Sequence, residues 1–197
     1  TSGQTVTRLR ISNPNGPCIS GSGVSNVRIT DNIIGPCAAD TSGVGVKLWQ
    51  SSNIRIDNNT FDDVASGVYA QGDATTILDN IVVDHNRATR IRGPYPRGQL
   101  VQFNSINGSG HRVECNVSDN TNPGYLAGPE DQINMYSSNG TAASPILLRY
   151  NKLRGGGPSL NGGGILAGDS AGSYQIVDSN ILVNPGNYGV AIAGGNN

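Results

Sequence analysis

An aliphatic residue, two variable residues and an asparagine form a short pattern that returns six times along the chain. In most copies the residue two positions after the asparagine is apolar or small, as Ile34 and Phe61 are. The segment Leu9-Arg-Ile11-Ser-Asn13 resembles an imperfect earlier copy. Fixed self-similarity of this kind marks a repeat architecture. The six asparagines are Asn32, Asn59, Asn86, Asn116, Asn151 and Asn180, at intervals of 27, 27, 30, 35 and 29 residues.

A second apolar pattern follows each asparagine, in which two apolar residues flank one variable residue. Alternation with a period of two is typical of a strand that buries one face. Each repeating unit therefore contains two or three short strands. The alternating pairs are Val46 and Leu48, Val68 and Ala70, Val101 and Phe103, Ile133 and Met135, Ile165 and Ala167, and Val190 and Ile192.

A unit of this size cannot bury its apolar face alone, whereas stacked units bury one continuous column. The pattern therefore predicts an all-β protein, a parallel β-helix of about seven coils in a single domain over residues 1–197. A sandwich or a propeller is the alternative. Those folds favour two-residue hairpin turns, which do not join the units here.

The recurrent asparagines lie where the chain turns between two strands, at the same place in each coil. An amide side chain there can satisfy the backbone groups of the turn and bond to the asparagines above and below. We therefore interpret these residues as an internal asparagine ladder with a structural role, and we do not count them as site residues.

Composition agrees with this fold and limits the partners. Charged residues make up only 14% of the chain, and 28 Gly and 23 Asn punctuate short runs of Ile, Val and Leu that disordered chains lack. The net charge is −1, so nothing draws the protein to nucleic acid, and no apolar run is long enough for a membrane span.

The two ends of the predicted rod need covering, because a β-helix exposes strand edges there. The sequence starts at Thr1 with no initiating Met and no signal peptide, and neither Thr1–Thr7 nor Gly194–Asn197 resembles a cap. We expect a processed protein or part of a longer chain, whose ends meet further domains or subunits.

The asparagine ladder and the repeated Ile-x-x-Asn-x-Ile pattern resemble the right-handed parallel β-helix repeats of the pectate-lyase-like superfamily, over residues 5 to 195. The resemblance implies the hand of the solenoid, a polysaccharide partner and an extracellular, cell-surface or periplasmic location. It does not imply one reaction, because that superfamily holds lyases, hydrolases, epimerases, phage tailspikes and adhesins, and fold does not determine function.

In each second strand, the residue between the two apolar residues and the residue after them would face outward. Stacking of the coils would line these residues up in two columns along the rod. From the second to the fifth coil they mix aromatic residues with amides, which suits sugar rings and their hydroxyls. The alternative is that they only stabilise the sheet through cross-strand contacts. The candidate substrate-binding residues are Lys47, Tyr69, Gln102 and Asn134 in the first column and Trp49, Gln71, Asn104 and Tyr136 in the second; the columns continue as Leu166 and Ala191, and as Gly168 and Ala193.

Two short strings are similar to strings of pectate lyases. Val82-Val83-Asp84-His85-Asn86 is similar to their Trp-Ile-Asp-His string, without the Trp, and Arg92-Gly-Pro94-Tyr-Pro-Arg97 matches their Arg-x-Pro-x-x-Arg string. The resemblance implies an arginine base that removes a proton from a uronate, with Arg92, Arg97 and Asp84 as the catalytic candidates. Here the strings lie much closer together than in that family, and His85 falls at a turn of the repeat itself.

Two insertions carry further charged side chains. The segment from Arg87 to Gly98 has four arginines and two prolines, which suits an anionic ligand such as a uronate or sulfated sugar, or a solvated loop. The longest insertion ends in Glu130-Asp131. These paired acids could serve glycosidic hydrolysis, hold a Ca²⁺ ion as metal ligands, or form a solvated loop end.

Cysteines add one structural expectation. Cys18 and Cys37 each follow Gly-Pro in adjacent copies, so stacked coils would bring them near disulfide distance, while Cys115 has no such partner.

Two functions remain open. The first is a secreted or surface β-helix that binds a polysaccharide, with lyase or glycoside hydrolase activity as possible extensions. The second is a non-catalytic structural or adhesive solenoid within a larger surface protein.

Overall fold

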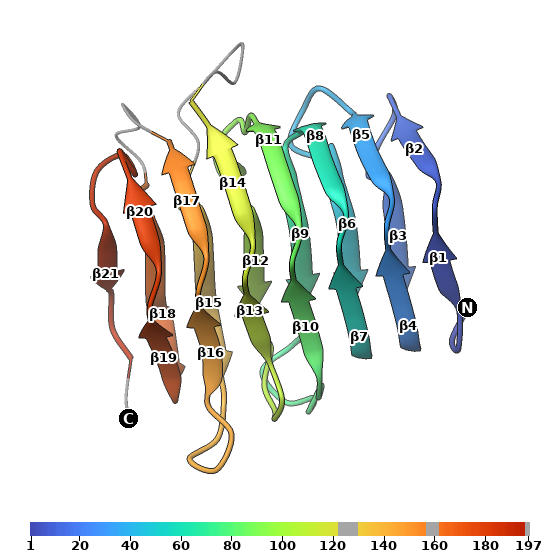
Figure 1. Cartoon of the computed structure of the whole chain (residues 1–197). Coiled ribbons are helices and arrows are strands. Elements are labelled where there is room, and N and C mark those ends of the chain that lie inside the picture. Colours follow the sequence, from blue (N-terminus) through green and yellow to red (C-terminus); the bar gives the residue numbers. More distant parts are fainter. Residues whose placement is uncertain (122–129, 157–161, 196–197) are drawn as a thin grey trace.

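The computed structural model describes residues 1–121, 130–156 and 162–195, and in these residues every regular element is a strand. The strands form three parallel sheets of seven, here called sheets A, B and C. Each coil adds one strand to each sheet in turn, so coil 1 is β1–β3 and coil 7 is β19–β21. Figure 1 shows the seven coils side by side. The predicted parallel β-helix is therefore confirmed, with three strands in each unit.

The strand bounds follow the three sheets. Sheet A consists of β1 (Thr5–Thr7), β4 (Ser25–Thr30), β7 (Ser52–Asp57), β10 (Ile81–Asp84), β13 (Arg112–Glu114), β16 (Ile146–Arg149) and β19 (Gln175–Asp178). Sheet B consists of β2 (Arg10–Asn13), β5 (Ile33–Cys37), β8 (Thr60–Val64), β11 (Arg87–Ile91), β14 (Val117–Asn120), β17 (Lys152–Gly155) and β20 (Ile181–Val183). Sheet C consists of β3 (Ile19–Ser22), β6 (Val44–Trp49), β9 (Ser66–Gln71), β12 (Val101–Asn104), β15 (Ile133–Asn139), β18 (Ile165–Ser173) and β21 (Val190–Ile192).

The corner between sheets A and B is the same short turn in every coil. Its first residue has a positive φ, between 52° and 59°, and the next residue lies at the ladder position. A single left-handed residue turns the chain sharply without a longer loop. His85 is one of these residues, which explains its place in the repeat; the full set is Arg8, Asp31, Asn58, His85, Cys115, Tyr150 and Ser179.

The asparagine ladder runs through six of the seven coils. In the central rung, Asn86 Nδ2 donates to Asn116 Oδ1 at 3.0 Å and to the carbonyl of Ile56 at 2.9 Å. Its own Oδ1 accepts from both the backbone N and the Nδ2 of Asn59, each at 3.0 Å. Because each rung contacts the coil before and the coil after, the ladder fixes the stacking register of the whole solenoid.

The first coil differs from the expected copy. Val6 pairs with Ile29, so the ladder position of coil 1 is Leu9. The backbone N of Leu9 donates to Asn32 Oδ1 at 3.1 Å, but its side chain offers no oxygen. Asn13 instead bonds locally, to the carbonyl of Pro17 and the backbone N of Asn15. The ladder therefore ends at coil 1.

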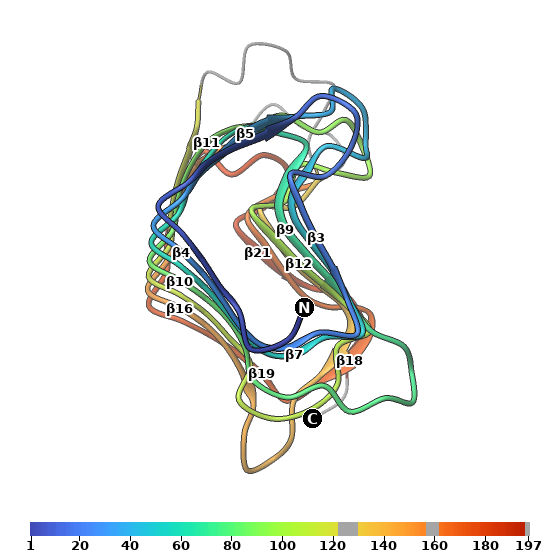
Figure 2. The ribbon, with the colours of Figure 1, turned by 90° about the vertical axis from the view of Figure 1, so that its right-hand side faces the viewer.

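The core is one column of apolar side chains between the three sheets, whose ribbons Figure 2 shows along the axis of the rod. The predicted alternating pairs face inward: Val68, Val101 and Ile133 are fully buried, as are the larger Phe61 and Phe103. Loops at the corner between sheets C and A project from the rod (Figure 2). Variation in coil length is thus confined to corners, and the outer face of sheet C lies between corner segments.

Replacing Asn86 with Ala tests the ladder. The change removes five hydrogen bonds and leaves buried donors and carbonyls of the neighbouring coils unpaired, so we expect a loss of roughly 3 kcal/mol or more in the free energy of unfolding. Asn187→Ala is the control, because this residue is exposed, and it should change stability by less than about 0.5 kcal/mol. Denaturant titration followed by circular dichroism measures both; equal losses would contradict the ladder's role.

Candidate functional site

The first predicted column on sheet C is present in the structure. Backbone register places Lys47 beside Tyr69, Tyr69 beside Gln102, and Gln102 beside Asn134. The column then continues through Leu166 to Ala191, as the alternation predicts. Four neighbouring strands, β6, β9, β12 and β15, thus present a cation, a tyrosine and two amides in one line.

The second column follows the prediction through coil 5 and then departs from it. Trp49, Gln71, Asn104 and Tyr136 pair in sequence across the same four strands. Beyond Tyr136 the register shifts, and its partner is Asp169 instead of the expected Gly168. A β-bulge inserts one residue and re-aims the side chains that follow it. The structure therefore places a carboxylate where the alternation predicted a glycine.

From coil 3 to coil 5 the side chains of the first column are buried, whereas those of the second column and Lys47 of coil 2 are partly or fully exposed. Trp49 is 44% exposed and Tyr136 is 38% exposed, whereas Tyr69 and Asn134 in the first column are buried. Asn104 Nδ2 donates to the Tyr69 hydroxyl at 3.0 Å, and that hydroxyl donates to Gln71 Oε1 at 3.1 Å. Hydrogen bonds therefore hold the side chains of coils 3 and 4 in place, while the rings of Trp49 in coil 2 and Tyr136 in coil 5 are exposed on the face.

Arg97 covers the middle of this face. Its guanidinium carbon lies 4.2 Å from the centre of the Tyr69 ring, and its Nη1 donates to Gln102 Oε1 at 3.3 Å. A guanidinium over an aromatic ring is held by a cation–π contact and still offers its other N–H groups. Arg97 thus brings a second cation to the same face as Lys47.

Carboxylates gather beside the face in coils 5 and 6. Asn134 Nδ2 donates to Asp131 Oδ2 and to Asp169 Oδ2, each at 2.9 Å. Asp131 is buried and also accepts from the backbone N of Gly163 and from the Tyr188 hydroxyl. Asp131 therefore joins coils 5, 6 and 7, while the Oδ1 atom of Asn134 is buried with no hydrogen-bond partner among the described residues.

Glu130, next to Asp131, has a carboxyl group whose pKa is raised. Burial first, and then the charges of Asp131 and Asp169, raise the pKa of the Glu130 carboxyl to about 7, against the hydrogen bond that Gln99 donates to it. A carboxyl with a pKa near neutrality can exchange a proton at physiological pH, as a general acid or base must. The acid pair predicted at Glu130 and Asp131 is therefore not a solvated loop end.

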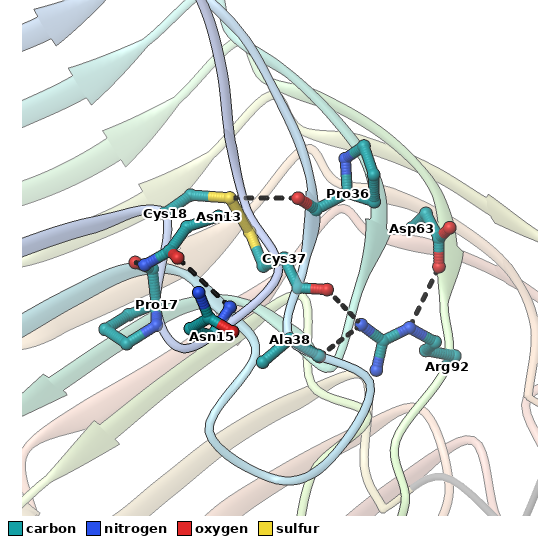
Figure 3. The surroundings of a disulfide bond; sticks show 9 residues. All are labelled: Asn13, Asn15, Pro17, Cys18, Pro36, Cys37, Ala38, Asp63 and Arg92. Atoms are coloured by element: carbon teal, nitrogen blue, oxygen red, sulfur yellow. Dashed lines mark hydrogen bonds and ion pairs between the residues drawn. A yellow bond between two sulfur atoms is a disulfide. The ribbon is translucent and has the colours of Figure 1, made fainter.

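Arg92 has a structural role in this geometry. It is 2% exposed, and its guanidinium donates to the carbonyls of Cys37, Ala38 and Ala39 and to the carboxylate of Asp63. Figure 3 shows it pointing at the backbone that follows the Cys18–Cys37 disulfide. The predicted disulfide is present, with the two Cα atoms 5.5 Å apart. A buried guanidinium engaged in this way does not fit a base that must reach a polymer.

The three lyase candidates do not come together. Asp84 ends β10 on sheet A, where Arg55 binds it with both Nε and Nη2, at 3.3 Å and 2.8 Å. Arg92 follows the opposite end of β11, so the whole strand separates it from Asp84. Asp84 belongs to the salt-bridged outer face of sheet A, with Arg28–Asp57 and Arg149–Glu114 as similar pairs. Of the three, only Arg97 reaches the face of sheet C.

The arginine-rich segment is less of a loop than expected. Arg87 and Arg90 lie in β11, and Arg90 pairs with Asp62 at 2.5 Å. Only the end of the segment leaves the sheets.

Sequence reasoning missed Asp169, Tyr188 and Gln99. The positive φ of Gly168 and the register shift go together, and a glycine inside a strand was the available signal for a bulge beside Asp169. Tyr188 and Gln99 reach the cluster from other coils, so no spacing in the sequence indicates them.

Two expectations about metals and membranes can be compared with the described residues. Among them, no group of three His, Cys, Asp or Glu side chains is placed to hold a metal ion. Ca²⁺ binding by Glu130 and Asp131 stays a prediction. No helix among them has the length and apolar character needed to cross a membrane.

Comparison with known proteins identifies the family and nothing narrower. The family model described as right handed beta helix region matches residues 1–197, and the chain belongs to this family. The hand implied by the sequence resemblance is thereby confirmed. No curated protein and no solved structure matches the chain.

Substitution separates the two arginines of the Arg-x-Pro-x-x-Arg string. Arg92→Met removes the shared donor of the buried carbonyls of Cys37 and Ala38 in coil 2, together with one ion-pair partner of Asp63, so we expect a loss of roughly 3 kcal/mol or more in the free energy of unfolding. Arg97→Met should cost less than about 1 kcal/mol, because its contacts are partly exposed. Denaturant titration gives both values, and the reverse order would contradict these roles.

The Glu130 carboxyl predicts a pH dependence of stability. Its folded pKa, about 7, lies above the ordinary value of 4.5, so the folded state resists ionisation and loses stability as pH rises from 4.5 through 7. Glu130→Gln removes this loss and should be more stable than the parent at pH 8 by on the order of 1 to 2 kcal/mol, discounted for partial exposure. At pH 4 the two proteins should differ little. Thermal melts of both proteins across this pH range measure the difference in stability. A difference that does not change with pH would refute the pKa assigned to Glu130.

Proposed function

We propose that this right-handed β-helix protein binds a polysaccharide along the outer face of sheet C, over coils 2 to 5. The observation that carries the proposal is the strand register, which aligns Lys47, Trp49, Tyr136 and the amides between them in two continuous columns. Aromatic rings pack against the C–H faces of sugars, and amides bond their hydroxyls in either direction.

Acidic sugars suit the N-terminal half of this face. Lys47 is exposed on coil 2, and Arg97 lies over Tyr69 on coil 3, so two cations flank the aromatic side chains there. Guanidinium and ammonium groups favour carboxylate or sulfate substituents through charge-assisted hydrogen bonds. Coils repeat about 4.8 Å apart along the rod. A polymer lying along the axis would therefore meet a new row of side chains at each coil.

Hydrolysis of the bound polymer is a second candidate function, favoured by the pKa of Glu130. The protonated Glu130 carboxyl would donate its proton to the glycosidic oxygen as the bond from that oxygen to the anomeric carbon breaks. The Asp169 carboxylate would either deprotonate the water that attacks the anomeric carbon, or attack that carbon itself and form a glycosyl intermediate that water then hydrolyses. Asp131 is held by three donors and serves as a positioning residue. This assignment replaces the lyase set of Arg92 and Asp84.

The extracellular or cell-surface location is part of the same proposal. The Cys18–Cys37 disulfide supports it, because such bonds persist mainly in oxidising compartments. A non-catalytic structural solenoid is the competing function, and the binding experiment below distinguishes it.

Affinity electrophoresis against neutral and acidic polysaccharides tests the binding face. We expect retardation by at least one acidic polymer, and Trp49→Ala with Tyr136→Ala should weaken it about tenfold or more, since both rings are exposed on the face. Tyr150→Asn is the matched control: Tyr150 is also exposed, at 52%, but lies at the corner of sheets A and B, where Asn58 occupies the same turn position. Retardation that survives the double change, or that the control abolishes, would contradict the face.

The same samples test hydrolysis by the release of new reducing ends. Glu130→Gln and Asp169→Asn should each lower the rate at least a hundredfold while leaving retardation unchanged, because neither carboxyl belongs to the two columns that bind the polymer over coils 2 to 5. Retardation with no product in the parent protein would leave a binding module and remove the hydrolase.

A further inference from the structure

The corner between sheets B and C is short in coil 3 and longer in the coils on either side. In coil 3 only Ala65, which is buried, separates β8 from β9. At the same corner, residues 38–43 form the coil 2 loop and residues 92–100 form the coil 4 loop. The backbone N of Gly93 donates to the carbonyl of Ala65 at 3.2 Å, so the coil 4 loop lies over the short corner. It can therefore reach the coil 2 loop, two coils away.

Two arginines of the coil 4 loop donate to backbone carbonyls of the coil 2 loop. The guanidinium of Arg92 donates to the carbonyl of Ala38, as Figure 3 shows, and to that of Ala39 at 3.0 Å. Nearer the other end of the coil 4 loop, Arg97 Nε donates to the carbonyl of Thr41 at 3.3 Å. The path of the coil 2 loop therefore helps to set where Arg97 lies.

The coil 2 loop is itself held at both ends. It follows Cys37, which the disulfide ties to Cys18 of coil 1. At its other end the backbone N of Gly43 donates to the carbonyl of Asp40 at 3.1 Å, and a Cβ atom at position 43 would overlap the carbonyl oxygen of Ala38. Only glycine allows so close an approach between two stretches of backbone. The loop therefore presents its carbonyls to the arginines in one arrangement.

Arg97 joins three coils on the binding face. Besides the Thr41 carbonyl of coil 2, its guanidinium contacts the Tyr69 ring of coil 3 and Gln102 Oε1 of coil 4. These hydrogen bonds use Nε and Nη1, and no described residue accepts a hydrogen bond from Nη2. A guanidinium held in this way can still donate to a carboxylate or sulfate group beside it.

We propose that the coil 2 loop is a positioning element for Arg97 and that it thereby determines the preference of the binding face for acidic polymers. This inference rests on the function proposed above. The Thr41 carbonyl holds the guanidinium over Tyr69 before a polymer arrives, so binding does not have to order a flexible side chain. An acidic substituent of a sugar at coil 3 then meets a donor that is already in place.

Gly43→Ala in the full chain tests the positioning without any ligand. The added methyl group forces the coil 2 loop to move away from the Ala38 carbonyl, so we expect loss of the nuclear Overhauser contacts between the side chain of Arg97 and the ring of Tyr69. Gly16→Ala is the matched control, because a Cβ atom there would meet only Asn13 Nδ2, at 3.6 Å, and neither glycine has a positive φ. The control should keep the contacts.

A double-mutant cycle tests the specificity by affinity electrophoresis. Gly43→Ala should weaken retardation by acidic polymers about fivefold or more, the scale of one charge-assisted hydrogen bond. In the Arg97→Met background the same change should have no further effect, because the loop acts through Arg97. A loop that only stabilised the fold would not give this dependence on Arg97.

Two results would overturn the proposal. The first is retention of the contacts between Arg97 and Tyr69 in Gly43→Ala. The second is an equal loss of acidic-polymer binding in the presence and absence of Arg97. If circular dichroism shows that Gly43→Ala does not fold, Cys18→Ser replaces it in both experiments, because it releases the start of the coil 2 loop without changing a residue of that loop.

Failure of the proposed function gives a different result. A parent protein that no polymer retards would contradict polysaccharide binding, and with it the specificity assigned to the coil 2 loop. The contacts between Arg97 and Tyr69 are read without polymer, so they decide whether the loop positions Arg97 in either case.

Discussion

The continuous hydrogen bonding of the asparagine ladder is the constraint on which the remaining structure depends. An internal ladder side chain such as Asn86 donates to the coils before and after it and accepts from the coil before it, so no coil can slip along its neighbour without leaving buried amides unpaired. Register fixed at this corner also sets the register of the strands that leave it, except where a bulge shifts it, as happens after Asn134 on sheet C. The side-chain columns on sheet C and the charge pairs on sheet A both depend on this fixed register.

Those columns give one face two chemically different halves. Toward the N-terminus the face carries Lys47, Arg97 and aromatic rings; toward the C-terminus it adjoins Glu130 and Asp169. The division follows from the bulge after Tyr136, which replaces a small residue with a carboxylate. Binding and proton transfer, if one polymer uses both, would thus be separated along the axis by the distance of a few coils.

The sequence was sufficient for features that repeat and insufficient for features that occur once. Periodicity predicted the sheets, the ladder, the disulfide and the order of both columns through coil 5, because stacking imposes the same environment on equivalent positions. It could not place Asp169, since a bulge breaks the alternation from which the columns were read. Nor could it show that Arg92 is buried, because its guanidinium donates to carbonyls some 55 residues earlier in the chain, and no local sequence pattern indicates such a long-range contact.

The Arg92 hydrogen bonds and the Cys18–Cys37 disulfide both cross-link coils in the N-terminal half of the rod. Cys18–Cys37 ties coil 1 to coil 2, and Arg92 extends from coil 4 across Asp63 of coil 3 to the backbone of coil 2. The first four coils are therefore cross-linked to one another by more than sheet pairing. Coils 5 to 7 are joined instead by hydrogen bonds to Asp131. A pulling force or a protease acting on the C-terminal end would therefore have to break only non-covalent contacts among the described residues before it met the Arg92 contacts and the disulfide.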